Sequence, residues 1–143
     1  MPTWTDNARQ CLEAHRVGHL ATAGADGAPH VVPVCYALDD VGLYFVADLK
    51  PKRGPAHQLR RLENLRQNPQ AAVVVDDYDD DWSRLAWVMV RGPAAFVDAT
   101  DHVAALTLLR ARYAGYRSMA LDDPQAHPII RIEPAHVRSW RAA

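Results

Sequence analysis

The sequence has few cysteines and no excess of positive charge. Two cysteines occur among 143 residues, Cys11 and Cys35, and they lack CxxC spacing, so neither a disulfide framework nor a metal site is expected. Lys and Arg number 16 against 17 Asp and Glu, a formal net charge of −1, which argues against a nucleic-acid partner. We therefore expect no metal, no nucleic acid and a reducing, cytoplasmic location.

Long apolar runs and familiar catalytic motifs are also missing. No segment approaches the roughly 20 apolar residues that a membrane span requires, and no secretory leader pattern opens the chain. The GxSxG, Walker, GxGxxG and HExxH motifs do not occur, which disfavours the hydrolase and nucleotide-binding chemistries that use them. The chain is long enough for one core and short for two, so we expect a single domain, residues 1–143, with no membrane contact.

The residues that are present predict a mainly β protein with inserted helices. Asp26-Gly27 supplies a tight turn before a strand that runs from His30 to Tyr36. Pro33 in that strand cannot donate a ladder hydrogen bond, and it marks a sheet edge, a bulge or an opening towards a ligand. The remaining expected elements are helices near 5–16, 59–68 and 100–113, the last capped by Thr100 and Asp101, and strands at 19–22, 43–46, 71–75, 86–97 and 129–132. About six strands at hairpin-like spacing favour a small closed antiparallel barrel, with a bend at Gly92-Pro93.

Positive charge is concentrated in one segment. Between Lys50 and Arg66 six cations face one acid, Glu63. These cations are Lys50, Lys52, Arg53, Arg60, Arg61 and Arg66. A cationic loop followed by a helix N-terminus suits a phosphate, because ammonium, guanidinium and unpaired amide groups all donate to it. A solvated basic face is the alternative.

Three further residue types are candidates for a ligand site. Trp82 follows an acidic stretch, Asp76–Asp81, and either anchors that loop or forms an aromatic wall for a flat ligand. The acidic loop lacks EF-hand spacing, so an exposed loop is favoured over a cation site. His30 is either an ordinary strand residue or a polar group at the mouth of a cleft, and Tyr36 is either a core residue or a cofactor contact.

Several segments together resemble the pyridoxamine-phosphate-oxidase-like superfamily in order and spacing. They are RVGHLAT (16–22), DGxPHVVPV (26–34), YF (44–45), KPKR (50–53), RLxNL (61–65) and NP (68–69). The continuation VDDYDDDW (75–82) and WVxVxG (87–92) resembles the subgroup of F420-dependent enzymes. The strand of the second hairpin lacks the Arg and Lys pair that holds the FMN phosphate in true pyridoxamine-phosphate oxidases.

The resemblance implies a six-stranded antiparallel split β-barrel that forms a homodimer with two cofactor clefts at the interface. It places a flat ring against the strand from His30 to Tyr36, the cofactor phosphate on the basic segment, and an aromatic side chain, Trp82, reaching across from the partner subunit. The implied cofactor contacts are His30, Val31, Val32, Pro33, Val34, Tyr36, Lys50, Lys52, Arg53, Arg61 and Trp82.

The expected function is that of an F420-dependent oxidoreductase, which transfers a hydride between the reduced deazaflavin and a small unsaturated or aromatic molecule. An FMN-dependent reductase or oxidase of the same fold, and a non-catalytic carrier of flavin or haem, are the alternatives. No side chain is identified as catalytic. If the substrate needs a proton, Tyr36, His30 and Tyr78 are the candidate donors.

Overall fold

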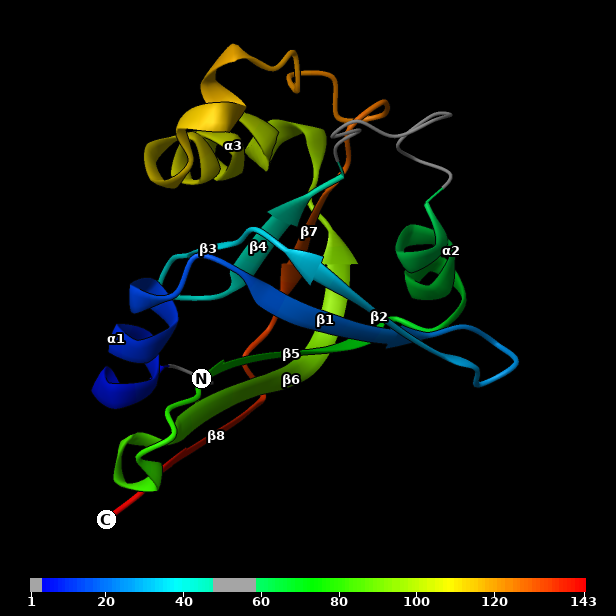
Figure 1. Ribbon diagram of the computed structural model, residues 1–143. Helices are drawn as coiled ribbons and strands as arrows, with labels where there is room; N and C mark the ends of the chain where they lie inside the picture. Colours follow the sequence, from blue (N-terminus) through cyan, green and yellow to red (C-terminus); the bar gives the residue numbers. More distant parts are fainter. Residues whose placement is uncertain (1–3, 48–58) are drawn as a thin grey trace.

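The computed structural model describes residues 4–47 and 59–143 and contains one strongly curved antiparallel sheet with helices around it (Figure 1). The strands are β1 (Gly18–Ala23), β2 (Pro29–Val34), β3 (Ala37–Leu38), β4 (Leu43–Val46), β5 (Gln70–Asp77), β6 (Ala86–Phe96), β7 (Ile129–Ile132) and β8 (His136–Arg141). Their order is β2-β1-β5-β6-β7-β4-β3, and β8 also pairs with β6. The sheet curls into a half-barrel, which confirms the expected split-barrel class.

Strand β6 joins the two parts of this sheet by changing partners. Its first half pairs with β8, ending at the pair Arg91 and His136, and its last residues pair with β7, beginning at Ala94 and Ile132. The chain between β7 and β8 crosses β6 at Gly92, where an added Cβ atom would lie 2.0 Å from the Glu133 carbonyl oxygen. The expected bend at Gly-Pro is therefore a change of partner along one continuous strand.

Three α-helices and three short 3-10 helices complete the described chain. These are α1 (Asp6–Ala14), α2 (Arg60–Gln67), α3 (His102–Arg112), η2 (Trp82–Arg84), η3 (Ala99–Asp101) and η4 (Ala114–Ser118). The Thr5 side chain caps α1 by accepting from the Ala8 amide over 3.2 Å. Asp101 occupies the predicted N-cap position of α3, but its side chain makes no capping hydrogen bond, and Thr100 lies within η3.

Two apolar clusters hold these elements together. The larger one lies inside the curved sheet, where α1 contributes Leu12 and α2 contributes Leu62 and Leu65. The smaller one lies between α3 and strands β3, β4 and β7, and includes Leu106 and Leu109. Burial of these side chains is the main stabilising contribution to such a fold.

The strand count differs from the expected six. The six anticipated strands appear as β1, β2, β4, β5, β6 and β7, while β3 and β8 are additional. β3 has two residues and β8 is largely exposed, so neither carries the run of apolar residues by which a buried strand is predicted. β5 also continues through Asp77 into the stretch expected as a loop. Among the described residues, no helix is long and apolar enough to span a membrane.

Candidate functional site

Helix α2 is fixed against the β1–β2 hairpin by polar contacts. The Asn64 side chain donates to the Thr22 hydroxyl over 3.0 Å, and the Ala25 amide donates to Gln67 Oε1 over 2.8 Å. At Gly24, a Cβ atom would lie 2.6 Å from Gln67 Oε1 and 2.9 Å from Asn64 Oδ1. The glycine therefore permits the close approach that sets the position of α2 beside the edge of the sheet.

The four cations predicted to hold a phosphate fall into two groups. Arg61 is described: it lies on α2 one turn before Asn64 and is 7% exposed, so it belongs to the packed side of the helix. Lys50, Lys52 and Arg53 lie outside the described residues, and their contribution remains a prediction.

The described residues at both ends of the cationic segment are well anchored. Ala47, after β4, donates its amide to the Pro128 carbonyl over 2.9 Å, and its own carbonyl lies 3.0 Å from His127 Nδ1. On the other side, Leu59 is the N-cap of α2. The described residues on either side of Lys50, Lys52 and Arg53 thus lie beside the loop before β7 and at the N-terminus of α2.

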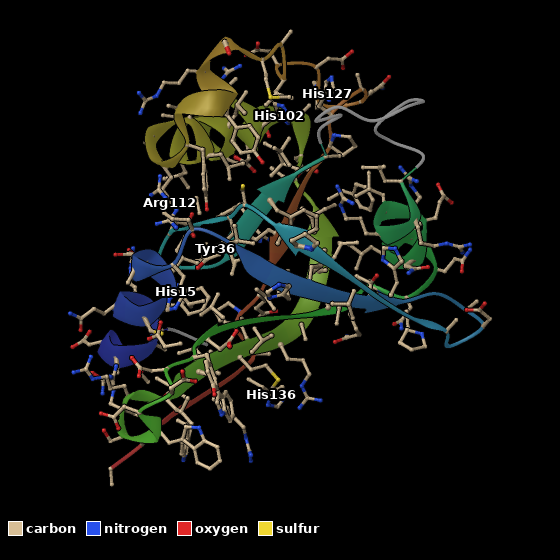
Figure 2. The ribbon with its side chains drawn as sticks, in the orientation of Figure 1. His15, Tyr36, His102, Arg112, His127 and His136 are labelled. Carbon is tan, nitrogen blue, oxygen red and sulfur yellow. The ribbon has the colours of Figure 1, made fainter. Side chains whose placement is uncertain are left out.

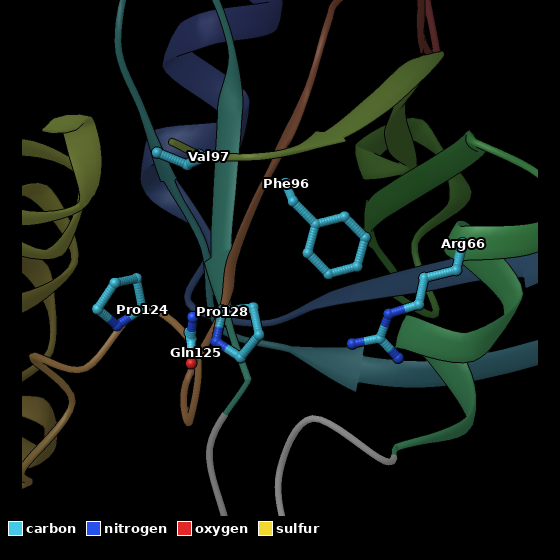
Figure 3. Close-up of a pocket in the computed structure, with 6 residues that line it drawn as sticks. All are labelled: Arg66, Phe96, Val97, Pro124, Gln125 and Pro128. Atoms are coloured by element: carbon cyan, nitrogen blue, oxygen red, sulfur yellow. The ribbon is translucent and has the colours of Figure 1, made fainter. Parts of the chain in front are cut away.

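A cavity of about 470 Å³ lies between the last turn of α2, the end of β6 and the loop before β7 (Figure 3). Its walls are Arg66, Phe96, Val97, Pro124, Gln125 and Pro128. Figure 3 shows Arg66, from α2, directed towards Phe96 at the end of β6, with the guanidinium 5.2 Å from the ring centroid. This volume suits a small organic ligand. Arg66 belongs to the cationic segment and Phe96 and Val97 to a predicted strand, but none of the six was among the predicted cofactor contacts.

The strand predicted to receive a flat ring is the open edge of the sheet. His30, Val31, Val32, Pro33 and Val34 all lie in β2, and among the described strands β2 pairs with β1 alone. Val31 is 62% exposed, while Val34 faces the core. Of the three interpretations left open for Pro33, a sheet edge, a bulge or an opening, the described strands show the edge.

The register of β2 shows which of its backbone groups are open. Pro29 and Pro33 lie opposite Ala23 and His19, and neither can donate a hydrogen bond to β1. Along an antiparallel ladder, hydrogen-bonded and non-hydrogen-bonded residue pairs alternate. Val31 lies two residues from each proline, so it too is in a non-hydrogen-bonded pair and directs its N–H and C=O groups away from β1. The edge therefore presents one donor, the Val31 amide, beside several carbonyl acceptors.

His30 lies on the side of β2 that faces α2. It is paired with Thr22, whose hydroxyl contacts Asn64 of α2, and residues directly opposite in a ladder project to the same face. Its Nδ1 atom is buried and has no hydrogen-bond partner among the described residues. An unsatisfied buried polar atom costs about 1–3 kcal/mol. A ligand that forms a hydrogen bond with His30 Nδ1 would therefore bind more tightly than one that does not.

Tyr36 lies apart from this group, between α1 and the end of α3 (Figure 2). The side chain is fully buried, and its hydroxyl donates to the carbonyl oxygens of Leu12 and His15. Burial raises the pKa of Tyr36 above its usual value. The Arg112 guanidinium lies 5.2 Å from the ring centroid. The Tyr36 side chain is thus engaged in packing α1 and α3 against the sheet.

Trp82 and Tyr78 lie at the other end of the β5–β6 hairpin and are each 70% exposed. Asp81 caps the short η2 helix, and hydrogen bonds from the hydroxyl and amide of Ser83 lower the pKa of this carboxyl. β5 has eight residues between α2 and this loop, a length of roughly 26 Å at about 3.3 Å per residue. Trp82 therefore cannot reach α2 of its own chain.

Comparison with known proteins gives one match that covers nearly the whole chain. Residues 4–141 match the family described as pyridoxamine 5'-phosphate oxidase. Over 67 residues the chain is 37% identical to the 5a,11a-dehydrotetracycline/5a,11a-dehydrooxytetracycline reductase of Streptomyces rimosus, an alignment that covers 46% of this chain and 44% of that enzyme. The chain thus spans less than half of this curated relative.

Solved structures show the same fold. The conserved hypothetical protein Rv2991 from Mycobacterium tuberculosis superposes with a TM-score of 0.76 at 22% identity, covering 98% of this chain and 87% of the other. A FAD-binding protein from Mesorhizobium loti superposes with a TM-score of 0.70 at 27% identity, covering 99% and 97% of the two chains. Fold and sequence agree, and the chain belongs to the pyridoxamine 5'-phosphate oxidase family.

Proposed function

We propose that the protein is an F420-dependent oxidoreductase that transfers a hydride between the reduced deazaflavin and a small unsaturated or aromatic substrate. The observation that carries the oxidoreductase class is the family match over residues 4–141. A reductase among the relatives and a FAD-binding protein among the solved structures support it. The preference for F420 over FMN rests on the motifs at 75–82 and 87–92.

The open edge of β2 suits the polar rim of a deazaflavin ring. That rim alternates carbonyl, N–H and carbonyl groups, so it needs both a donor and an acceptor from the protein. The Val31 N–H and C=O groups provide one of each, with the Pro29 and Pro33 carbonyls on either side. His30 Nδ1, buried and without a partner among the described residues, is a further group that the ligand could satisfy. The described edge therefore satisfies one ring carbonyl and the ring N–H, and the second ring carbonyl needs a donor from elsewhere.

The anionic part of the cofactor would bind the basic residues that precede α2 and that lie in its first turn. F420 carries a phosphate and an oligoglutamate tail, and several negative charges match the cations Lys50, Lys52, Arg53 and Arg61 better than the single phosphate of FMN does. An FMN-dependent enzyme of the same fold remains the alternative.

A homodimer is part of the proposal, because the face of the sheet that points away from the core carries apolar side chains among its polar ones. Direct pairing places Pro33, Val74 and Met89 on this face in one row with His19 and Arg138, and Trp87 lies opposite Trp140 of β8 on the same side, next to Asp76. Trp140 is 46% exposed. Apolar surfaces with exposed tryptophan are typical of protein interfaces. A second copy on this face would offer its own Trp82 to the site beside α2, which Trp82 of the same chain cannot reach.

The bound deazaflavin would supply a hydride donor or acceptor at its C5 position. The protein would contribute orientation through the β2 backbone, exclusion of water through the interface, and electrostatic stabilisation through the basic segment. Of the three candidate proton donors, Tyr36 has a buried hydroxyl with a raised pKa, which makes it a weak acid at neutral pH. His30 lies in β2 itself, and Tyr78 would have to come from the partner with Trp82.

Titration of the purified protein with F420 and with FMN, followed by fluorescence, tests the cofactor. We expect saturable binding of F420 and at least roughly tenfold weaker binding of FMN, a difference of about 1.4 kcal/mol. Tight binding of FMN alone would refute the F420 assignment and leave the oxidoreductase class intact. Mixing reduced F420 with candidate enones and quinones then separates an enzyme from a carrier, since a carrier leaves the absorbance of the reduced cofactor unchanged.

A further inference from the structure

A second cavity, of about 400 Å³, lies where α3 ends and η4 begins. It adjoins Cys35, the residue that follows β2, and its walls include Tyr113, Tyr116 and Met119. Among the described residues that line the cavity, the charged one is Arg16. The cavity adjoins, at Cys35, the strand on which the resemblance places the ring, but its aromatic wall at Tyr113 and Tyr116 belongs to no predicted cofactor contact.

The aromatic wall of the cavity is held rigidly. The Tyr113 hydroxyl accepts from the Tyr36 amide over 3.0 Å and lies 2.9 Å from the carbonyl oxygens of both Tyr36 and Arg16, to which it can donate. The Tyr116 ring meets the Tyr113 ring edge-on, with centroids 5.6 Å apart and an interplanar angle of 68°. A ligand would find these rings already oriented, so little conformational freedom is lost on binding.

The surroundings of the cavity are positively charged. Three arginines lie at or near the end of α3: Arg110, Arg112 and Arg117. Among the described residues there, Arg110 forms an ion pair with Asp122 over 3.2 Å. Arg16 contributes a fourth guanidinium, 5.0 Å from the Tyr113 ring centroid.

Arg16 retains donor capacity for a ligand. One of its five N–H groups donates to the Arg112 carbonyl, and the side chain is exposed at the cavity. An anion at this position would gain a charge-assisted hydrogen bond.

We propose that this cavity binds a planar aromatic carboxylate of two fused rings. The ring system would pack on Tyr113, Tyr116 and Met119, and the carboxylate would accept hydrogen bonds from Arg16. The volume lies within the range of small-molecule sites, and sulfur and aromatic walls favour a polarisable ring over an aliphatic one. The site is independent of the cofactor proposed for the β2 edge.

Gly115 offers a direct test, because a Cβ atom added there meets nothing within 4 Å. Gly115 lines the cavity, and a Gly115→Leu side chain adds volume at its wall without a clash at Cβ. We expect 2-naphthoate to bind the full-length protein in a fluorescence titration, and Gly115→Leu and Arg16→Gln each to weaken that binding by roughly tenfold or more. Gly115→Ala is the control for the backbone, and Arg117→Gln is the control for charge, because its side chain donates to backbone carbonyls of α3 and does not line the cavity.

The uncharged analogue 2-naphthamide separates the two parts of the proposal. We expect it to bind native protein more weakly than 2-naphthoate does, and to bind native protein and Arg16→Gln alike. Thermal unfolding of each variant verifies that it is folded. Native-like affinity in Gly115→Leu, or loss of affinity in Arg117→Gln equal to that in Arg16→Gln, would overturn the site. Displacement of 2-naphthoate by F420 would overturn its independence from the cofactor, and unchanged affinity at saturating F420 supports it.

Discussion

Gly92 is the position where a single methyl group should disturb the fold most. An added Cβ atom would lie 2.0 Å from the Glu133 carbonyl oxygen and 3.1 Å from the Ala135 amide nitrogen. Both neighbours are backbone atoms, so no flexible side chain can move aside. The chain joining β7 to β8 would have to shift by about 1 Å or more to reach ordinary contact distance.

The cost follows from the contacts that such a shift disturbs. The Glu133 amide donates to the Pro93 carbonyl over 2.8 Å, and the Ala135 amide donates to the Glu133 carbonyl over 2.8 Å. Overpacking costs about 1–3 kcal/mol, and weakening two hydrogen bonds adds about 0.5–1.5 kcal/mol each. We therefore expect Gly92→Ala to lower the free energy of unfolding by about 2–6 kcal/mol, a large part of the roughly 5–15 kcal/mol that a domain has.

Urea denaturation and thermal unfolding measure this effect. A domain near 150 residues loses roughly 2–4 °C of Tm per kcal/mol, so we expect a decrease of about 4–24 °C. Gly115→Ala is the matched control, because its methyl group meets open space, and it should leave Tm nearly unchanged. Equal stability of Gly92→Ala and Gly115→Ala would refute the close crossing described here.

Three further outcomes are expected. Replacing both Lys52 and Arg53 by Ala should weaken F420 binding by about 1–3 kcal/mol for each charge-assisted bond lost, and unaltered affinity would remove the phosphate assignment. Trp82→Ala should weaken F420 binding without lowering the monomer's Tm, since the side chain is 70% exposed; an unchanged titration would contradict its reach across the interface. Burial opposes the charge on His15, but hydrogen bonds to the Cys11 carbonyl and to Asp77 outweigh it and raise the pKa of His15. Protonated His15 therefore stabilises the fold at low pH, and this contribution is lost as pH rises through the raised pKa. The difference in urea midpoint between native protein and His15→Gln should shrink from pH 5.5 to pH 8. A difference that grows with pH would contradict a raised pKa.

The sequence predicts those parts of the fold that depend on local chemistry. Gly27 has a φ of 74°, as the predicted Asp-Gly turn requires, and Pro33 lies in an edge strand as its missing amide proton demands. β8 was missed because its six residues are largely exposed and hydrogen-bond to β6 through backbone groups, which leave no periodic pattern of side chains.

The candidate site is less predictable for a different reason. The cavity beside Phe96 depends on Pro124, Gln125 and Pro128, which a long connection after α3 brings beside α2. Such proximity depends on the path of the chain, and no local motif encodes it. Arg61 was identified from a motif, but its burial reflects the packing of α2, which the motif alone does not specify.

The edge of β2 has a consequence for association of the protein with itself. An unpaired strand edge ordinarily invites a strand from another molecule and so promotes aggregation. In β2, Pro29 and Pro33 remove two of the amide donors that a continuous intermolecular ladder would need, and Val31 keeps the one between them. The edge thus resists strand addition while remaining able to form a short, two-point contact with a small molecule.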